Sequence, residues 1–265
     1  MKRLIINSDD YGRTPDISRG IREAHLRGVV TSTTCMMNIP TTVSDIAIAL
    51  QETPKLGLGV HLVLTMGKPI SAPESILSLV DEDHNFFKYD PLLERLSQLN
   101  MDEVKREWRA QIGRFIQATG QKPTHIDSHH HSSYFSADLF RGMLELAKEY
   151  DCAIRYPFNE VSRELAETAK HVPGLIQEFS PRRPDIFFVN FYDESATKDK
   201  LLSLLSSVGE GTSEIMCHPG YVDDAFANES VYNFQRDREL KILTDPDIRA
   251  AIEAQNIELI TFADL

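Results

Sequence analysis

Four histidines lie within seven residues in the segment Thr124 to His131, which reads THIDSHHH and also contains Asp127. A neutral imidazole is a good ligand for a divalent metal ion, and a carboxylate beside it can add a ligand or hold the ring in one tautomer. The alternatives are a solvated polar loop that happens to be rich in histidine, or an expression tag. Because the cluster is internal and interrupted, it predicts a metal site.

Further residues that could bind a metal ion occur at three other places in the chain. These are the pair Asp9 and Asp10, then His61, and then His218. Each of them lies in or just after an apolar run that is typical of a buried strand. In a parallel barrel the loops after the strands form one rim, and the reacting groups meet there. A histidine alone in a strand is as often a core residue as a ligand, so it is this shared rim that favours a functional role for His61.

Strands and helices are expected to alternate along the chain. Apolar and β-branched runs predict strands at 3–7, 29–37, 57–64, 153–157, 186–190, 214–217 and 259–262, with one more in the histidine cluster. Capping residues and helical apolar spacing predict helices at 15–27, 42–51, 101–119 and 198–208, and another that begins at 136. This alternation implies parallel strands, so an α/β, TIM-like barrel of seven or eight strands is favoured over an open sheet. The 265 residues fit one such domain, 1–265.

Side-chain alternation directs the polar residues of two strands to one side. In the strand 57–64, Gly59 and His61 share a face that resembles the interior of a barrel. His125, Asp127 and His129 share a face if their segment stays extended. We therefore expect both strands to present imidazoles to the same interior.

Residues 66–100 form a long excursion, and a loop of this length in a compact domain is more often functional than idle. This segment could form a lid over the site or a contact in a homodimer, and the sequence leaves both interpretations open. Phe86, Phe87 and Tyr89 lie in its middle, where stacking on a sugar ring is one role and anchoring of the loop is the favoured one. Arg155, at the end of the fifth expected strand, is a candidate for orienting a carboxylate or binding substrate, although a surface ion pair is the commoner case.

The composition excludes several classes of partner. The chain has 28 Lys and Arg against 40 Asp and Glu, a net charge of −12, which argues against nucleic acid because phosphate binding requires a basic face. No apolar run approaches the length of a membrane span, and the basic N-terminus lacks the apolar core of a signal peptide. The three separate cysteines are best explained as buried thiols, so we expect a cytoplasmic protein.

Five motifs together resemble those of the YdjC/ChbG carbohydrate deacetylase family. They are INSDDYG at 6–12, VTSTT at 30–34, GVHLVLT at 59–65, THIDSHHH at 124–131 and MCHPG at 216–220. The resemblance spans most of the chain and implies a distorted parallel β/α barrel. It also implies a metal-dependent hydrolase that removes N-acetyl groups from amino sugars such as chitooligosaccharides, with release of acetate.

The resemblance also suggests roles for individual residues. The implied ligands of one divalent ion, Mg²⁺ or Zn²⁺, are Asp10, His61 and His129, with Asp9 as general base and His218 as general acid. Contacts with the substrate or around these ligands are expected from His125, Asp127, His131, Arg155 and Tyr221. The spacing of His125 and His129 would also suit paired metal ligation from one turn of a helix, as in polysaccharide deacetylases.

The chemistry of these residue types agrees with that assignment. An acetamide is a poor electrophile, and a divalent ion with an open position can polarise its carbonyl and lower the pKa of a bound water. Adjacent Asp9 and Asp10 point in alternate directions on an extended segment, so one can bind metal while the other accepts a proton. An imidazole can then protonate the leaving amine, the role expected of His218. By ligand type the set fits zinc, although nickel, cobalt, iron or magnesium can occupy such a site.

Two rival functions are considered. A barrel metallo-phosphoesterase with several ions usually has more ligands, commonly a His-x-His pair after the first strand, where this chain has Ser8, Asp9 and Asp10. A non-catalytic, metal-containing carbohydrate-binding protein would not need candidates for both a base and an acid. The sequence therefore favours a deacetylase.

Overall fold

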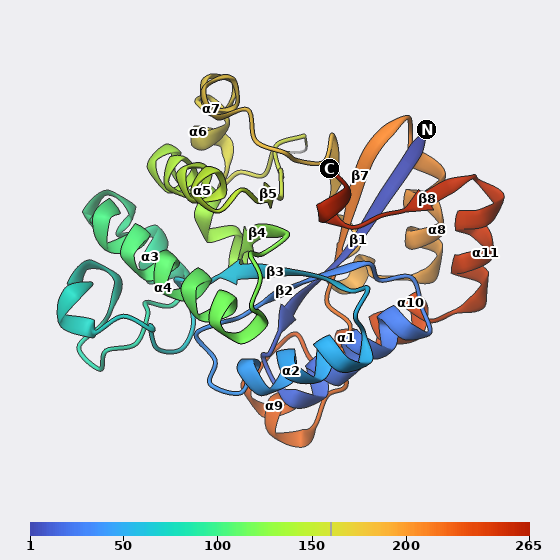
Figure 1. The fold of residues 1–265 in the computed structure, drawn as a ribbon, viewed down its shortest axis with the longest axis horizontal. Coiled ribbons are helices and arrows are strands. Elements are labelled where there is room, and N and C mark those ends of the chain that lie inside the picture. Colours follow the sequence, from blue (N-terminus) through green and yellow to red (C-terminus); the bar gives the residue numbers. More distant parts are fainter. Residues whose placement is uncertain (160) are drawn as a thin grey trace.

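The computed structural model describes residues 1–159 and 161–265, and within them eight strands form one curled sheet (Figure 1). The path of the sheet is β5-β4-β3-β2-β1-β7-β6, and β8 pairs with the first part of β1. The strands are β1 (Lys2–Tyr11), β2 (Ser32–Cys35), β3 (Gly57–Leu62), β4 (His125–Ser128), β5 (Ala153–Ile154), β6 (Ile186–Phe188), β7 (Gly211–Cys217) and β8 (Ile257–Leu259). All these pairings are parallel, so the prediction of a distorted parallel β/α barrel is confirmed.

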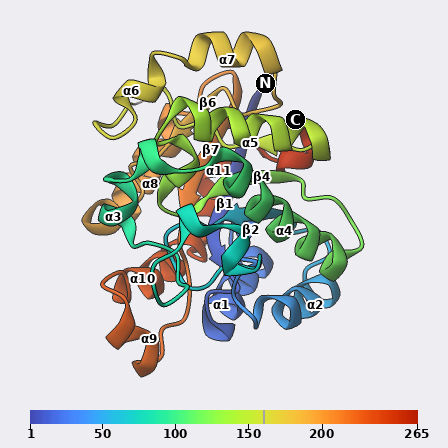
Figure 2. The same ribbon diagram turned by 90° about the vertical axis from the view of Figure 1, so that its left-hand side faces the viewer.

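Helices surround the outside of the sheet in both views (Figures 1 and 2). They are α1 (Pro15–Leu26), α2 (Thr42–Glu52), α3 (Tyr89–Leu93), α4 (Met101–Thr119), α5 (Ala137–Tyr150), α6 (Ala166–Ala169), α7 (Val172–Phe179), α8 (Lys198–Ser207), α9 (Asp224–Glu229), α10 (Phe234–Leu243) and α11 (Pro246–Ala254). Among the described residues, none of these helices combines the length and apolarity needed to cross a bilayer.

Three expected capping residues, Thr14, Gly120 and Ser136, lie at helix ends. Thr14 caps α1 with Pro15 at its first position, and Ser136 caps α5. Gly120 ends α4 in the left-handed conformation, with φ of 70°, which a glycine adopts without steric cost. Local sequence therefore fixes where these strand–helix units turn.

The barrel is distorted where β5 and β6, the two ends of the path, meet. These strands are only two and three residues long and share no ladder. One backbone bond, from the N–H of Ile154 to the oxygen of Arg182 at 2.9 Å, joins β5 to the segment before β6. Across the interior, Arg155 Nε donates to Glu214 Oε1 of β7 at 2.8 Å. Buried side chains therefore complete the closure that the backbone leaves open.

Alternation along β1 separates an apolar layer from a polar one. Leu4 and Ile6 point outward into the core between the sheet and the C-terminal helices. Ile5 points inward, into a small apolar layer near the start of the strand. Asn7 and Asp9 follow on the same inward side and are buried. The inward side of β1 is thus apolar at Ile5 and polar toward its carboxyl end.

The 66–100 excursion is anchored against α4. The Glu107 carboxylate accepts hydrogen bonds from the backbone N–H groups of Ile70 and Ser71, at 3.0 and 2.8 Å. Phe86 is 1% exposed and lies in the main core. The interpretation of this aromatic residue as an anchor is therefore confirmed.

Several element boundaries differ from the prediction. β1 extends to Tyr11 because it lies in the middle of the sheet, where neighbouring strands pair with it over most of its length. β2 and β5 are shorter than the predicted 29–37 and 153–157, and β8 precedes the predicted 259–262. Helices α9, α10 and α11 were not predicted. In α10 the apolar pattern is weak because buried positions carry polar and charged residues, namely Gln235, Arg236 and Glu239.

Candidate active site

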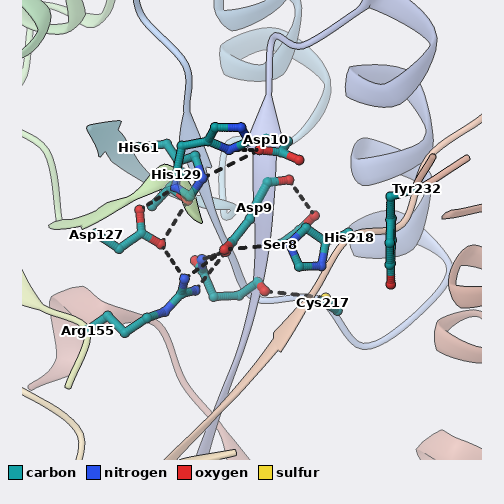
Figure 3. A network of polar contacts seen from close by, with 12 residues as sticks. Ser8, Asp9, Asp10, His61, Asp127, His129, Arg155, Cys217, His218 and Tyr232 are labelled. Atoms are coloured by element: carbon teal, nitrogen blue, oxygen red, sulfur yellow. Dashed lines mark hydrogen bonds and ion pairs between the residues drawn. The ribbon is translucent and has the colours of Figure 1, made fainter. Parts of the chain in front are cut away.

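Asp10, His61 and His129 meet at the carboxyl ends of β1, β3 and β4, as Figure 3 shows. Asp10 Oδ1 lies 3.4 Å from His61 Nε2 and 3.1 Å from His129 Nδ1. All three side chains are buried, and their candidate ligand atoms lie within 4.8 Å of one another. Two imidazoles and a carboxylate at this spacing could share one divalent ion.

The ring of His61 is held from behind by Asp127. The His61 Nδ1 atom lies 2.7 Å from Asp127 Oδ1, and because a carboxylate only accepts, Nδ1 carries the proton. Thr34 donates to the other Asp127 oxygen at 3.1 Å. Burial alone would lower the pKa of His61, but Asp127 and the neighbouring carboxylates outweigh it and raise the pKa to about 9. Asp127 therefore keeps the proton on Nδ1, so Nε2, once it has given up its own proton, is the nitrogen that can bind a cation beside Asp10.

A second group, Asp9, His61 and Asp127, also has the spacing of a metal site. However, Arg155 already neutralises both of its carboxylates, with Nη1 2.9 Å from Asp127 Oδ2 and 2.7 Å from Asp9 Oδ2. Its imidazole contributes the protonated Nδ1 to Asp127. A cation in this group would have to displace buried ion pairs, so the group around Asp10 is the better candidate.

Asp9 is fixed by a bidentate pair with Arg155. The two guanidinium nitrogens each lie 2.7 Å from one Asp9 oxygen, and Asn7 Nδ2 donates to Oδ1 at 2.9 Å. Burial opposes the charge of Asp9, but Arg155 outweighs it and holds the pKa of this carboxyl well below its usual range. Burial raises the pKa of Glu214, the third carboxylate on Arg155, to about 7. Asp9 therefore stays ionised in a buried position.

Asp10 reaches the same group of polar side chains as Asp9 because the strand is irregular here. The pairing of β1 with β2 shifts register between Ser8 and Tyr11, and Asp10 has φ of 69°. In a regular strand two successive side chains would point to opposite faces. The left-handed residue cancels this alternation, so both carboxylates contribute to one site.

His218 follows β7 and faces Asp9 from the other side of β1. Its Nε2 lies 3.9 Å from Asp9 Oδ2, and its backbone N–H donates to Glu239 Oε2 at 2.5 Å. The rings of Tyr192 and Tyr232 each lie 5.4 Å from its imidazole. Burial lowers the pKa of His218 to about 4 against the attraction of Asp9, so the ring is neutral at neutral pH.

Arg236, which was not among the predicted site residues, forms an ion pair with Asp10 Oδ2. Arg236 lies on α10, is 4% exposed, and also donates to the backbone oxygen of Tyr232 at 3.3 Å. Burial opposes ionisation of Asp10, but Arg236 and His129 hold its pKa well below its usual range. With Glu239 three residues later, Arg236 has the spacing of an ordinary solvated helical ion pair, so no local signal distinguishes it.

His125 lies outside both candidate metal groups. Its ring stacks on Phe262 with centroids 3.8 Å apart, and its Nε2 bonds Asn7 Oδ1 at 3.0 Å. It occupies a strand, so the spacing of His125 and His129 does not produce a helical pair of ligands. A Cβ atom on Gly59 would lie 2.6 Å from the His125 ring, which explains the glycine opposite it.

Of the two remaining predicted site residues, His131 lies beside the site and Tyr221 lies away from it. His131 contacts the ring of Phe187 at 6.0 Å, on the closing side of the barrel. Tyr221 donates to Glu23 Oε2 at 2.5 Å and lies against the Arg19 guanidinium, 4.3 Å from its ring centroid. Tyr221 is thus tied to the outer surface of α1, because the chain turns away from the rim after Gly220.

Comparisons with known proteins agree over the whole chain. The family model described as YdjC-like protein matches residues 3–254. A carbohydrate deacetylase of Clostridium beijerinckii is 38% identical, with 99% of this chain and 100% of the relative covered. A chitooligosaccharide deacetylase of Yersinia enterocolitica is 34% identical, with 99% of both chains covered.

Solved structures show the same relationship. A protein from Enterococcus faecalis V583, named for cellobiose-phosphate cleavage, superposes with a TM-score of 0.90 at 39% identity, covering 99% of this chain and 98% of the other. A family 4 acetyl xylan esterase from Clostridium thermocellum has a TM-score of 0.52 at 8% identity, covering 99% and 89%, and shares the fold alone. From its motifs, its fold and these matches, the chain belongs to the YdjC-like protein family.

Proposed function

We propose that this protein is a metal-dependent carbohydrate deacetylase, which hydrolyses the N-acetyl groups of acetylated amino sugars such as chitooligosaccharides and releases acetate. One observation carries the proposal. The metal-ligand candidates Asp10, His61 and His129 lie directly beside Asp9 and His218, a candidate base and acid that are themselves 3.9 Å apart. The names of the relatives, which cover the full chain at 34–39% identity, support the same chemistry.

The residues around Asp10 fit a divalent ion. Asp10 Oδ1 is buried without a hydrogen-bond partner among the described residues, although the imidazoles of His61 and His129 face it. When bound there, a divalent ion would polarise the acetamide carbonyl and lower the pKa of water. Two imidazoles and one carboxylate suit Zn²⁺ better than Mg²⁺, which prefers oxygen ligands, so we propose zinc first and magnesium second.

The protein side chains supply the proton transfers of the reaction. Asp9, kept ionised by Arg155, accepts a proton from the attacking water. As the C–N bond breaks, the leaving nitrogen receives a proton from His218 and departs as an amine, and the acetyl group leaves as acetate. Because His218 is neutral before the reaction, it must first take up a proton, and Asp9 is the nearest group that has gained one.

Acetate release tests this proposal directly. The protein, loaded in turn with Zn²⁺ and Mg²⁺, is incubated with N,N′-diacetylchitobiose, and acetate is measured. We expect release with at least one of the two ions, loss of release with a chelator, and recovery when the ion is restored. No acetate with either ion would contradict the proposal.

The two rival functions have less support. A phosphoesterase with several ions needs a second cation site, and the second candidate group shares His61 with the first and is tied to Arg155. A carbohydrate-binding protein without turnover would not need Asp9 and His218 within reach of the same point. Two or more ions per chain together with turnover of phosphate esters would favour the phosphoesterase.

We also propose that the protein acts in the cytoplasm. Cys35, Cys152 and Cys217 are all buried as free thiols. Buried free cysteines are typical of proteins that fold in a reducing compartment. Fractionation of the native host cells would test this assignment.

A further inference from the structure

Two rings, those of His130 and Tyr192, flank the candidate active site and remain open to solvent. His130 is exposed, and Tyr192 is 44% exposed, whereas Asp10, His61 and His129 between them are buried. His130 follows β4 and Tyr192 follows β6. The sheet order places these strands on opposite sides of β1, whose end carries the two aspartates.

The ring of His130 is fixed, yet one of its nitrogens is unoccupied. It stacks on His129 with centroids 3.9 Å apart, and Tyr89 packs edge-on at 5.4 Å. Its Nδ1 lies 3.0 Å from the hydroxyl of Thr65. In the described part of the chain, no group forms a hydrogen bond with its Nε2. The imidazole is therefore held in place with a free polar atom.

The backbone holds His130 in this position at a conformational cost. His130 and His131 both have φ of 57°, with ψ of 22° and 24°, and two successive left-handed residues other than glycine are disfavoured. This turn leaves His129 facing inward to Asp10 while His130 faces outward. Backbone strain of this kind concentrates at functional sites.

Tyr192 forms the opposite side and is supported by Tyr232. The two rings are stacked with centroids 4.7 Å apart and planes within 9°. Tyr232 is nearly buried, with its hydroxyl bonded to Glu239 and to the backbone N–H of Asp193. Asp193, directly after Tyr192, again has a left-handed φ, of 50°. A rigid stack thus presents Tyr192 beside His218.

We propose that His130 and Tyr192 are the two walls of a binding site for one pyranose ring of the acetylated sugar, an inference that rests on the proposed function. The scissile amide would lie between the Asp10 group and His218. Because His130 stacks on His129 and Tyr192 contacts His218, the sugar ring that carries the amide would lie between these walls. A pyranose has hydroxyl groups at its edge and C–H groups on its faces. The free Nε2 of His130 suits a hydroxyl, and the aromatic face of Tyr192 suits the C–H face.

This assignment also gives the 66–100 excursion a role. Tyr89, on α3 of the excursion, contacts His130 and lies 5.5 Å from the ring of Phe135. The excursion therefore supports the His130 wall from behind.

Kinetics of two wall variants test the proposal on the metal-loaded full chain. His130→Asn keeps a residue that tolerates a left-handed backbone, and Tyr192→Ala removes the ring. We expect the KM for N,N′-diacetylchitobiose to rise roughly 10-fold in each, the loss of about one hydrogen bond or one stacking contact, with kcat changed much less. Metal affinity and thermal stability should stay as in the wild type, and Tyr192→Phe should restore the KM.

A matched control is His84→Asn, because His84 is also exposed and left-handed, with φ of 60°, but lies in the turn that joins Asp81 to Asn85. Its KM should not change. An unchanged KM in both His130→Asn and Tyr192→Ala would overturn the inference.

Sugar binding separates failure of this inference from failure of the proposed function. If the wild type binds diacetylchitobiose without releasing acetate, the deacetylase proposal is contradicted. In that case, a dissociation constant that rises in both wall variants still supports the walls, and an unchanged one overturns them. If the wild type neither binds nor hydrolyses the sugar, both proposals are overturned.

Discussion

Asp9 and Asp10 are neighbours in sequence, are buried to the same degree and belong to one polar site, yet their surroundings differ. Both oxygens of Asp9 are engaged by Arg155, and Asn7 donates to one of them. Asp10 gives one oxygen to Arg236 and turns the other toward two imidazoles. Both oxygens of the first carboxylate are paired with a cation, whereas the second keeps an oxygen free of hydrogen bonds.

This difference shows how two identical residues acquire different roles. A cation that approached Asp9 would have to break a buried bidentate ion pair, which costs several kcal/mol. At Asp10 the ion pair with Arg236 uses only Oδ2, so Oδ1 and two ring nitrogens can form a set of ligands without breaking it. The comparison therefore predicts that metal binding depends on Asp10 and that proton transfer depends on Asp9.

The largest effect is expected for Asp10→Ala. The substitution removes the oxygen that the two imidazoles face, so metal binding and acetate release should both fall below detection. Metal content by elemental analysis and acetate assays check this outcome, with chelated wild type as the matched reference. A variant that keeps one ion per chain would show that the ion binds elsewhere, for example in the group with Asp127.

Asp9→Asn should separate the two functions. An amide cannot accept the proton of water, so turnover should fall by about 10²–10⁴-fold, the usual contribution of a general base. The ion should stay, because Asp9 is not one of its proposed ligands. Wild-type activity in this variant would show that Asp9 is not the base. Loss of the ion would show that Asp9, like Asp10, is needed for metal binding.

Asp127→Asn should have a smaller effect. It tests how much the partner of His61 contributes to metal binding at Asp10. The amide can still contact Nδ1 but no longer supplies a charge that fixes the tautomer. We expect metal affinity to weaken by about 10–100-fold, as is usual for loss of a partner that orients a ligand. Titration calorimetry of the ion into apo protein measures this change, and an unchanged affinity would contradict it.

Tyr221→Phe should have almost no effect on turnover. The residue belongs to a motif near His218, but its hydroxyl bonds Glu23 on the outside of α1. Loss of a surface hydrogen bond should change the free energy of unfolding by less than about 1 kcal/mol and leave kcat and KM unchanged. Thermal unfolding and steady-state kinetics test this, and a clear fall in kcat would bring Tyr221 into the site.

Much of the fold was predictable because the local signals are strong. Caps such as Thr14 and Ser136 and the left-handed Gly120 determine helix ends through contacts within a few residues. The alternation that places His61 and Asp127 on one face is also local, and the two side chains do meet at 2.7 Å. The short β5 and the added length of β1 were not predictable, since strand length depends on which strands lie beside it.

The sequence by itself determined that carboxylates and imidazoles follow successive parallel strands, because periodicity and capping are properties of short segments. Only the tertiary structure decided which of these side chains pair with arginines and which are left to bind a metal ion. The left-handed backbone at Asp10 brings two aspartates into one site. Arg155 and Arg236, which lie far away in the sequence, pair with one aspartate each. Ion pairs across 146 and 226 residues leave no trace in local spacing, yet they determine which carboxylate is free to bind a metal.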